Sequence, residues 1–318
     1  MNFSEEFHYS PEVLALAGGV GGAKLALGLA ICLPPGDLMV CVNTGDDDKF
    51  HGLHVSPDLD TMMYTLAGLA NEKSGWGVAN DTFTALEMLR KFGVDTWFNL
   101  GDRDLATHIR RTQLLADGMT LSEVTDKLNK ALGVLQLVVP MSDEPVKTVL
   151  ATNEGELAMQ RYFVGRRAEP KVSEIRYLGS ESATPSAGFQ DGLTRAGMLV
   201  MCPSNPYLSL GPILALPSVR QRIQAFPGKK VCVSPIVGGE AVKGPAGKIM
   251  AELGKEVSCV QVAREYQDIC DVFVMDKTDK ELASQIEEMG ITPLVTSTIM
   301  DTAEDKIVLA KEILALAV

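Results

Sequence analysis

The sequence has few of the features that mark several common classes of protein. Its formal net charge is −12, so it lacks the basic stripe with which proteins bind nucleic acid. None of its six cysteines forms a Cys-x-x-Cys pair, and most stand in apolar runs, which favours buried reduced thiols over structural zinc. It has only four histidines and neither a His-Glu-x-x-His pair nor a Gly-x-Ser-x-Gly elbow, which argues against zinc and serine hydrolases.

Long hydrophobic runs and a secretory signal are also missing. The longest apolar runs are interrupted by glycine, proline or charge well before the roughly 18 residues that suggest a membrane span. The first residues, MNFSEEFHYSPE, are acidic and aromatic and have neither the basic nor the apolar region of a signal peptide. We therefore expect a cytoplasmic protein that does not bind membranes.

The chain has ample apolar material for a folded core. Of its 318 residues 46% are hydrophobic, enough for one large domain or two smaller ones. Short apolar runs that end in polar loops predict buried strands of a parallel sheet. The strands predicted for this sheet are Val13–Ala17, Leu38–Val42, Gly197–Cys202, Lys230–Ser234, Asp271–Met275 and Ile291–Thr296. The pattern changes near Val134, and Leu135–Pro140, Val146–Thr152 and Met159–Val164 are predicted strands of an insertion. The predicted helices are the segment after Gly18, Thr61–Ala70, Asn80–Phe92, Leu105–Leu115, Leu121–Leu132 and Ala303–Ala317.

This order of elements predicts an α/β fold with a Rossmann-like parallel sheet flanked by helices. We expect residues 1–134 and 191–318 to form a nucleotide-binding core and residues 135–190 to form a smaller inserted α+β subdomain. In open parallel sheets ligands bind at the carboxyl ends of the strands. The polar loops that follow the predicted strands are therefore expected to converge on one edge of the sheet.

A glycine-rich turn follows the first predicted strand. Gly19, Val20, Gly21, Gly22 and Lys24 stand between this strand and the first helix. Bare backbone N–H groups and the positive end of a helix suit a phosphate, and the lysine adds a point charge. The run matches neither the dinucleotide nor the P-loop fingerprint, and a tight turn without a ligand is the alternative. The number of glycines favours phosphate binding.

Carboxylates crowd the region after the second predicted strand. Asp46, Asp47 and Asp48, followed by Asp58 and Asp60, place five acidic residues within fifteen positions. Such carboxylates repel one another unless they are solvated or bridged by a cation. Mg²⁺ takes one or two carboxylates together with phosphate oxygens, which suits this composition, and a solvated acidic loop is the alternative. In an extended backbone Asp47 points away from its neighbours, and only some of the five are expected to bind metal.

Both tryptophans stand among polar residues. Trp76 precedes Asn80 and Asp81, and Trp97 precedes Asn99. Flat aromatic surface beside polar groups suits a planar heteroaromatic ligand. Asp81 as a simple helix N-cap and the tryptophans as core residues are the alternatives.

The helix that follows Trp97 carries basic residues. His108, Arg110 and Arg111 lie on the predicted helix Leu105–Leu115. We expect one of them to reach a phosphate and two to face solvent.

Later strand ends carry small polar residues and lysines. Ser204 and Asn205 follow one strand, and Ser234 ends another. Lys243 and Lys248 flank a Gly-Pro-Ala-Gly turn before a helix, which is either a second anion site or a helix N-terminus with surface lysines.

Together these stretches resemble the 2-phospho-L-lactate transferase family of deazaflavin coenzyme biosynthesis. The matching segments include AGGVGGAKLALGL, VNTGDDDKFHGLHVSPDLDT, GWGVANDTF, LGDRDLATH, VVPMSDEPVKT, PSNPYLSLGPILALP, SPIVGGEAVKGPAGK and AREYQDICDVFVMD. They occur in one order over nearly the whole chain. Each motif is weak alone, but their joint occurrence is highly specific.

The resemblance implies a reaction. A guanosine diphosphate ester of lactate, or its enolpyruvyl equivalent, would donate its phospho-group to the ribityl hydroxyl of 7,8-didemethyl-8-hydroxy-5-deazariboflavin, releasing GMP with Mg²⁺ as cofactor. It implies Asp60 as the catalytic residue, with Asp47 and Asp60 at the metal and Asn99 at the deazaflavin, where the family position is often basic. It places the glycine turn and the Ser204–Asn205 and Lys243–Lys248 loops around the nucleotide, and it implies a homodimer.

Two other functions compete with this interpretation. A related regulatory family binds UDP-sugars without known transfer chemistry and shares the glycine turn and the acidic loop. The segments SPDLDT, GWGVANDTF and LGDRDLATH favour the transferase. An NAD-dependent dehydrogenase fits less well, because the glycine spacing differs and the carboxylates suit a metal better than a ribose.

Overall fold

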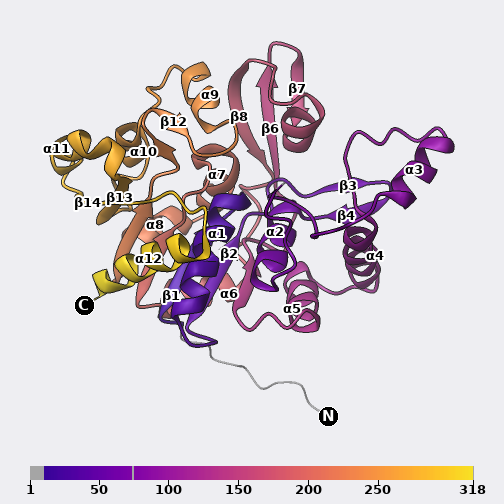
Figure 1. Ribbon diagram of the computed structural model, residues 1–318, viewed down its shortest axis with the longest axis horizontal. Helices are drawn as coiled ribbons and strands as arrows, with labels where there is room; N and C mark the ends of the chain where they lie inside the picture. The colour runs from indigo at the N-terminus through magenta and orange to yellow at the C-terminus, as the bar shows by residue number, and fades with distance from the viewer. Residues whose placement is uncertain (1–10, 74, 318) are drawn as a thin grey trace.

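A seven-stranded sheet forms the centre of the molecule. The computed structural model describes residues 11–73 and 75–317, so the acidic N-terminal stretch lies largely outside the described residues. The sheet has the order β14-β13-β10-β9-β1-β2-β5, and all of its strand pairs are parallel (Figure 1). Its strands are β1 (Val13–Ala17), β2 (Leu38–Val42), β5 (Leu137–Pro140), β9 (Met198–Met201), β10 (Lys229–Val233), β13 (Val272–Asp276) and β14 (Thr292–Thr296).

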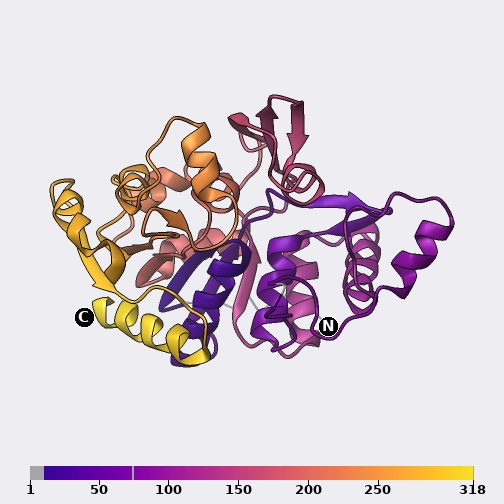
Figure 2. The same ribbon diagram turned by 45° about the horizontal axis from the view of Figure 1, so that its top comes forward.

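Helices cover both faces of this sheet (Figure 2). The continuous apolar run of β1 is buried throughout, because alternate side chains enter two different cores. Val13, Ala15 and Ala17 face the core that contains α1 (Gly19–Cys32), α2 (Pro57–Leu66), α5 (Leu121–Ala131) and α12 (Ala303–Leu314). Leu14 and Leu16 face the core that contains α6 (Ala187–Arg195), α7 (Gly211–Leu214), α8 (Val219–Gln224), α9 (Ala246–Glu252), α10 (Cys259–Glu265) and α11 (Ala283–Glu287). The predicted α/β class is confirmed.

A small antiparallel sheet lies within the expected insertion. It has the order β7-β6-β8, formed by β6 (Lys147–Thr152), β7 (Gly155–Ala158) and β8 (Val172–Leu178). β5 lies inside the predicted range 135–190, yet it pairs with β2 of the central sheet. The small sheet therefore begins only after Pro140.

The predicted strand Met159–Val164 is wrong. The segment forms a π-helical turn, η1 (Arg161–Gly165), with Tyr162 buried. Strands β7 and β8 already pair with both edges of β6, so no edge of that strand is left for this segment. Its apolar and aromatic residues indicated burial but could not indicate a strand partner.

Two predicted helices have different boundaries. The helix expected at Thr61–Ala70 is α2, which begins earlier because Pro57 fits the first helical position. The helix expected at Asn80–Phe92 is α3 (Thr84–Lys91). Asn80 has a positive φ of 55° and cannot belong to a right-handed helix.

A projecting arm extends from the side of the sheet (Figure 1). It contains α3, α4 (Asp102–Ala116) and a hairpin of β3 (Asp48–Phe50) and β4 (Leu53–Val55), which the sequence analysis did not predict. The remaining short elements are β11 (Ile236–Val237), β12 (Glu240–Ala241), η2 (Pro206–Leu210), η3 (Lys277–Leu282) and η4 (Ala315–Ala317). Within residues 11–73 and 75–317, no helix has the length and apolar character needed to cross a membrane.

Candidate active site

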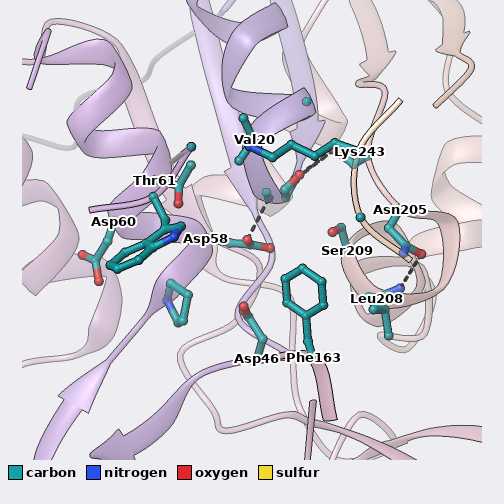
Figure 3. A pocket seen from close by; sticks show the side chains of 18 of the residues that line it. Val20, Asp46, Asp58, Asp60, Thr61, Phe163, Asn205, Leu208, Ser209 and Lys243 are labelled. Carbon is teal, nitrogen blue, oxygen red and sulfur yellow. Dashed lines mark hydrogen bonds between the residues drawn. The ribbon is translucent and has the colours of Figure 1, made fainter. Parts of the chain in front are cut away.

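One cavity of about 630 Å³ opens beside the carboxyl ends of the central strands. It is lined by the glycine turn after β1, the acidic loops after β2, the loops after β9 and β10, the arm, and the turn η1. In Figure 3, Lys243 reaches toward Val20 at the start of α1, while Asp46, Asp58 and Asp60 lie below them. The polar loops therefore converge on one edge, as parallel strands require.

The glycine turn lines the cavity with backbone atoms. Gly19 adopts a positive φ of 64°, and its N–H donates to Asp58 Oδ1 at 2.7 Å. The Gly18 N–H donates to Ser204 Oγ at 3.1 Å, so the first two N–H groups of the turn have protein partners. A phosphate would meet the next N–H groups, at Val20 and Gly21, both of which line the cavity.

Close packing explains part of the glycine content. A β-carbon at Gly21 would collide with the backbone oxygen of Pro203, and one at Gly22 would lie 2.6 Å from Ser204 Oγ. Gly22 is buried and does not line the cavity. The loop after β9 thus demands glycine here whether or not a phosphate binds.

The lysines differ in position. Lys24 and Lys243 both line the cavity, and burial, followed by the charge of Lys24, lowers the pKa of Lys243. An anion between the two amines would relieve this effect. Lys248 lies elsewhere: its Nζ donates to Glu252 Oε1 at 2.6 Å and to the Pro170 oxygen at 2.9 Å. The predicted phosphate contact of Lys248 therefore has no support in this geometry.

Ser204, Asn205 and Ser234 all line the cavity. Asn205 Oδ1 accepts from the N–H groups of Tyr207 and Leu208 and so caps η2. Ser234 Oγ donates to the Ile236 oxygen at 2.8 Å. These side chains shape the loops that line the cavity, and their contact with a ligand stays a prediction.

Two aspartates lie together on the acidic side. The amide of Asn43 donates to Asp58 Oδ2 at 2.9 Å and to Asp46 Oδ1 at 3.4 Å. Burial raises the pKa of Asp58 to about 6 despite the hydrogen bonds from Asn43 and Gly19. Burial, and then repulsion from Asp58, raise the pKa of Asp46 well above its usual value. A nearby positive charge would therefore stabilise the charged forms of these two carboxyl groups.

Asp47, a predicted metal ligand, lies outside the cavity lining. Its Oδ2 accepts from Ser56 Oγ at 2.7 Å and lies 3.2 Å from His54 Nε2. These two contacts hold the β3–β4 hairpin against the loop before α2. Its Oδ1 is buried without a hydrogen-bond partner. Extended spacing predicted that Asp47 points away from both neighbours, but a turn at Gly45 and Asp46 precedes it, and Asp48 lies outside the cavity lining as well.

Asp60, the predicted catalytic residue, lines the cavity and is bound by a buried arginine. Both Arg111 Nη atoms donate to its carboxylate, Nη1 to Oδ2 at 3.1 Å and Nη2 to Oδ1. Arg111 is 2% exposed and does not face solvent, so the expectation that two of the three basic residues of this helix do is wrong. His108 is also buried, and Arg110 alone of the three is exposed.

The next turn of α4 continues this buried network. Asp104 Oδ1 accepts from the Tyr64 hydroxyl at 2.7 Å and lies 3.2 Å from His108 Nε2. Burial, and then the charges of Asp60 and Asp104, raise the pKa of Tyr64, which keeps the phenol neutral. Tyr64 and Asp104 line the cavity, although nothing in the sequence analysis places them there, and His108, which the sequence analysis offers only as a possible phosphate contact, lines it as well. Their spacing with Arg111 on one helix face was the available signal.

The two tryptophans have different roles. Trp76 is 45% exposed and lines the cavity together with Phe98 and Phe163. Trp97 packs edge-on against Phe50 and Phe98, with Arg161 over its ring, and does not line the cavity. Asn99 does line it. The core alternative therefore holds for Trp97, and the ligand prediction keeps its geometric support for Trp76 and Asn99.

Asn80 and Asp81 do not line this cavity. Asp81 accepts from the N–H groups of Arg103 and Asp104 and so caps α4. Asp102 accepts in return from the N–H groups of Thr84 and Ala85 and caps α3. Asp81 therefore caps a helix N-terminus, as the alternative held. The helix that it caps is α4, whose first residue lies 21 positions after Asp81.

A magnesium ion fits the acidic side in part. No group of three or more potential protein ligands lies together among residues 11–73 and 75–317. Mg²⁺ needs only one or two carboxylates when phosphate supplies further oxygens. Asp46 and Asp58 supply such a pair at the cavity, whereas Asp60 is engaged by Arg111 and Asp47 lies outside.

Comparison with known proteins agrees with this geometry. Residues 13–311 match the family model described as 2-phospho-L-lactate transferase CofD. The chain belongs to this family. The resemblance seen in the sequence is therefore confirmed over nearly the whole chain.

The family's relatives carry two names. A 2-phospho-L-lactate transferase from Methanosarcina mazei is 39% identical over 92% of this chain and 96% of its own. One from Methanocaldococcus jannaschii is 40% identical over 95% and 97%. A phosphoenolpyruvate transferase from Streptomyces griseus is 40% identical over 96% and 98%. The protein is accordingly a transferase, and similarity alone does not distinguish the two kinds of group.

Solved structures share the fold at low identity. Two structures of a UPF0052 family protein from Bacillus halodurans align with TM-scores of 0.61 and 0.63. They cover 96% of this chain and 99% of their own, at 14% and 15% identity. At that identity the likeness concerns the fold alone.

Proposed function

We propose that the enzyme transfers a 2-phospho-L-lactyl or phosphoenolpyruvyl group from a guanosine diphosphate ester to the ribityl hydroxyl of 7,8-didemethyl-8-hydroxy-5-deazariboflavin. GMP leaves, and the reaction belongs to coenzyme F420 biosynthesis. One observation carries the proposal: a single cavity joins a phosphate-type wall with a wall of flat aromatic rings and carboxylates. A diphosphate donor and a planar alcohol acceptor can therefore meet there.

The two substrates divide the cavity between them. The donor's diphosphate would bind at the Val20 and Gly21 N–H groups with Lys24 and Lys243. The acceptor's ring would lie against Trp76, with its hydroxyl toward the acidic side. Such transfers need mainly in-line positioning and neutralisation of charge, and both walls supply these.

The carboxylates have two tasks in this arrangement. Asp46 and Asp58 would hold Mg²⁺, which neutralises phosphate charge when bound. Asp60, fixed by Arg111, would orient the attacking hydroxyl and accept its proton.

The decisive assay uses purified protein, the deazaflavin and each of the two guanosine diphosphate esters, with the product identified by mass. We expect a phosphodiester product with one ester, and no product in excess chelator. A protein that forms no product but binds a UDP-sugar tightly and the deazaflavin not at all would belong to the regulatory type instead. A homodimer is also proposed, and light scattering after gel filtration measures it.

A further inference from the structure

His108 is a buried side chain of the cavity that the proposed chemistry has not used. It lies on α4, four residues after Asp104 and three before Arg111, so all three occupy one helix face. Its side chain is 1% exposed, yet it lines the cavity beside Asp60 and Tyr64. A buried imidazole in a ligand cavity needs a partner for each ring nitrogen.

The neighbouring arginine determines where the imidazole carries its proton. His108 Nδ1 lies 3.3 Å from Arg111 Nη1. Arginine can only donate, so Nδ1 must accept, and the neutral ring then carries its proton on Nε2. Nε2 therefore presents a donor.

This donor has no hydrogen-bond partner among residues 11–73 and 75–317. Nε2 is buried and lies 3.2 Å from Asp104 Oδ1 without forming a hydrogen bond to it. Asp104 Oδ1 accepts a hydrogen bond from the Tyr64 hydroxyl instead. A buried unpaired N–H costs free energy that a ligand oxygen would recover.

The surrounding groups indicate the chemistry of that ligand. The carboxylates of Asp60 and Asp104 only accept hydrogen bonds, whereas His108 Nε2 only donates in this tautomer. A hydroxyl group does both, so it can donate to a carboxylate and accept from Nε2. We infer that His108 binds a hydroxyl of the acceptor's polyol chain through Nε2 and thereby favours polyhydroxylated acceptors. This inference rests on the proposed function.

Two substitutions separate the two ring nitrogens. In His108→Asn the side-chain oxygen can still accept from Arg111, but no donor reaches the Nε2 position. In His108→Gln the amide nitrogen reaches that position, while the contact with Arg111 is lost. We expect the asparagine variant to raise the KM for the deazaflavin about tenfold and to leave the donor KM unchanged. The glutamine variant should restore the deazaflavin KM to within about threefold of wild type, at a lower melting temperature.

A substrate analogue provides a test that does not depend on folding of a variant. The wild-type enzyme is given a deazaflavin whose side chain keeps only the terminal hydroxyl. We expect about tenfold weaker binding than for the full ribityl acceptor, measured by deazaflavin fluorescence. Equal binding of the two acceptors, or an unchanged deazaflavin KM in a folded His108→Asn protein, would overturn the inference. Absence of any deazaflavin binding or turnover by the wild type would instead overturn the proposed function.

Discussion

The two walls of the cavity are built by different physical means. The glycine wall, formed by Gly18–Lys24 and the loops after β9 and β10, offers backbone N–H groups and two partly exposed lysines. The acidic wall offers ionisable side chains that are largely buried, among them Asp60, Arg111 and Asp104. The first wall needs small residues so that backbones can approach, and the second needs partners so that charges can be buried.

The largest expected effect is on the acidic wall, at Asp60. Asp60→Asn removes the charge that would orient and deprotonate the hydroxyl, so kcat should fall at least about a hundredfold. Because Arg111 then lacks its counter-charge, we expect the variant to fold with a lower melting temperature, measured by circular dichroism.

Asp47→Asn is the matched control for this variant. The Asp47 side chain is 11% exposed but lies outside the cavity, so the loss of kcat in this variant should be far smaller. Equal losses of kcat in the two variants would support Asp47 as a metal ligand and would contradict its exclusion from the acidic wall.

The stability of the metal-free protein should also depend on the acidic wall. Asp58 has its pKa raised from 3.8 to about 6, so the folded state holds its proton more tightly than the unfolded state. The free energy of unfolding therefore falls as the pH rises from about 4 through about 6, by about 3 kcal/mol for this shift. Urea unfolding at pH values between 4 and 8 measures it, with Mg²⁺ expected to recover stability at pH 7.5 more than at pH 5. A flat profile in this window would contradict the buried state of the pair.

The glycine wall should be sensitive to a single methyl group. Gly21→Ala places a β-carbon against the Pro203 oxygen, so a backbone segment must move, at a cost of roughly 1–3 kcal/mol. The donor KM should rise as well, since the N–H groups of the turn move with it. Gly197→Ala is the control, because its nearest atom would be at 3.4 Å and its φ is not positive. Similar stability in both variants would show that the turn tolerates a side chain.

The smallest expected effect separates the two lysines of the predicted second anion site. Lys243→Met should raise the KM for the guanosine diphosphate ester about tenfold, because one charge is lost beside the diphosphate. Lys248→Met should change it by less than about threefold, since Lys248 pairs with Glu252. A larger rise in this KM for Lys248→Met would indicate that Lys248 also belongs to the glycine wall, although it lies outside the cavity lining.

The sequence predicted the glycine wall better than the acidic one. Strand β1, the turn and the loops after β9 and β10 are local patterns, and the predicted ligand residues of the turn and loops line the cavity, apart from Gly22 and Lys248. The partners of the acidic wall are distant in sequence, as in the pair Asp60 and Arg111. No local rule could show that Asp81 caps α4 and Asp102 caps α3.

By itself, the sequence determined the strands of the central sheet, several of the helices that flank it, and the family. Neighbouring residues specify buried strands and a glycine turn, because the spacing of apolar residues and the backbone freedom of glycine are local properties. Only the tertiary structure decided which of five crowded aspartates face the cavity and which tryptophan is core. These outcomes depend on the burial and pairing of each charge or ring, and segments far apart in the chain supply the partners.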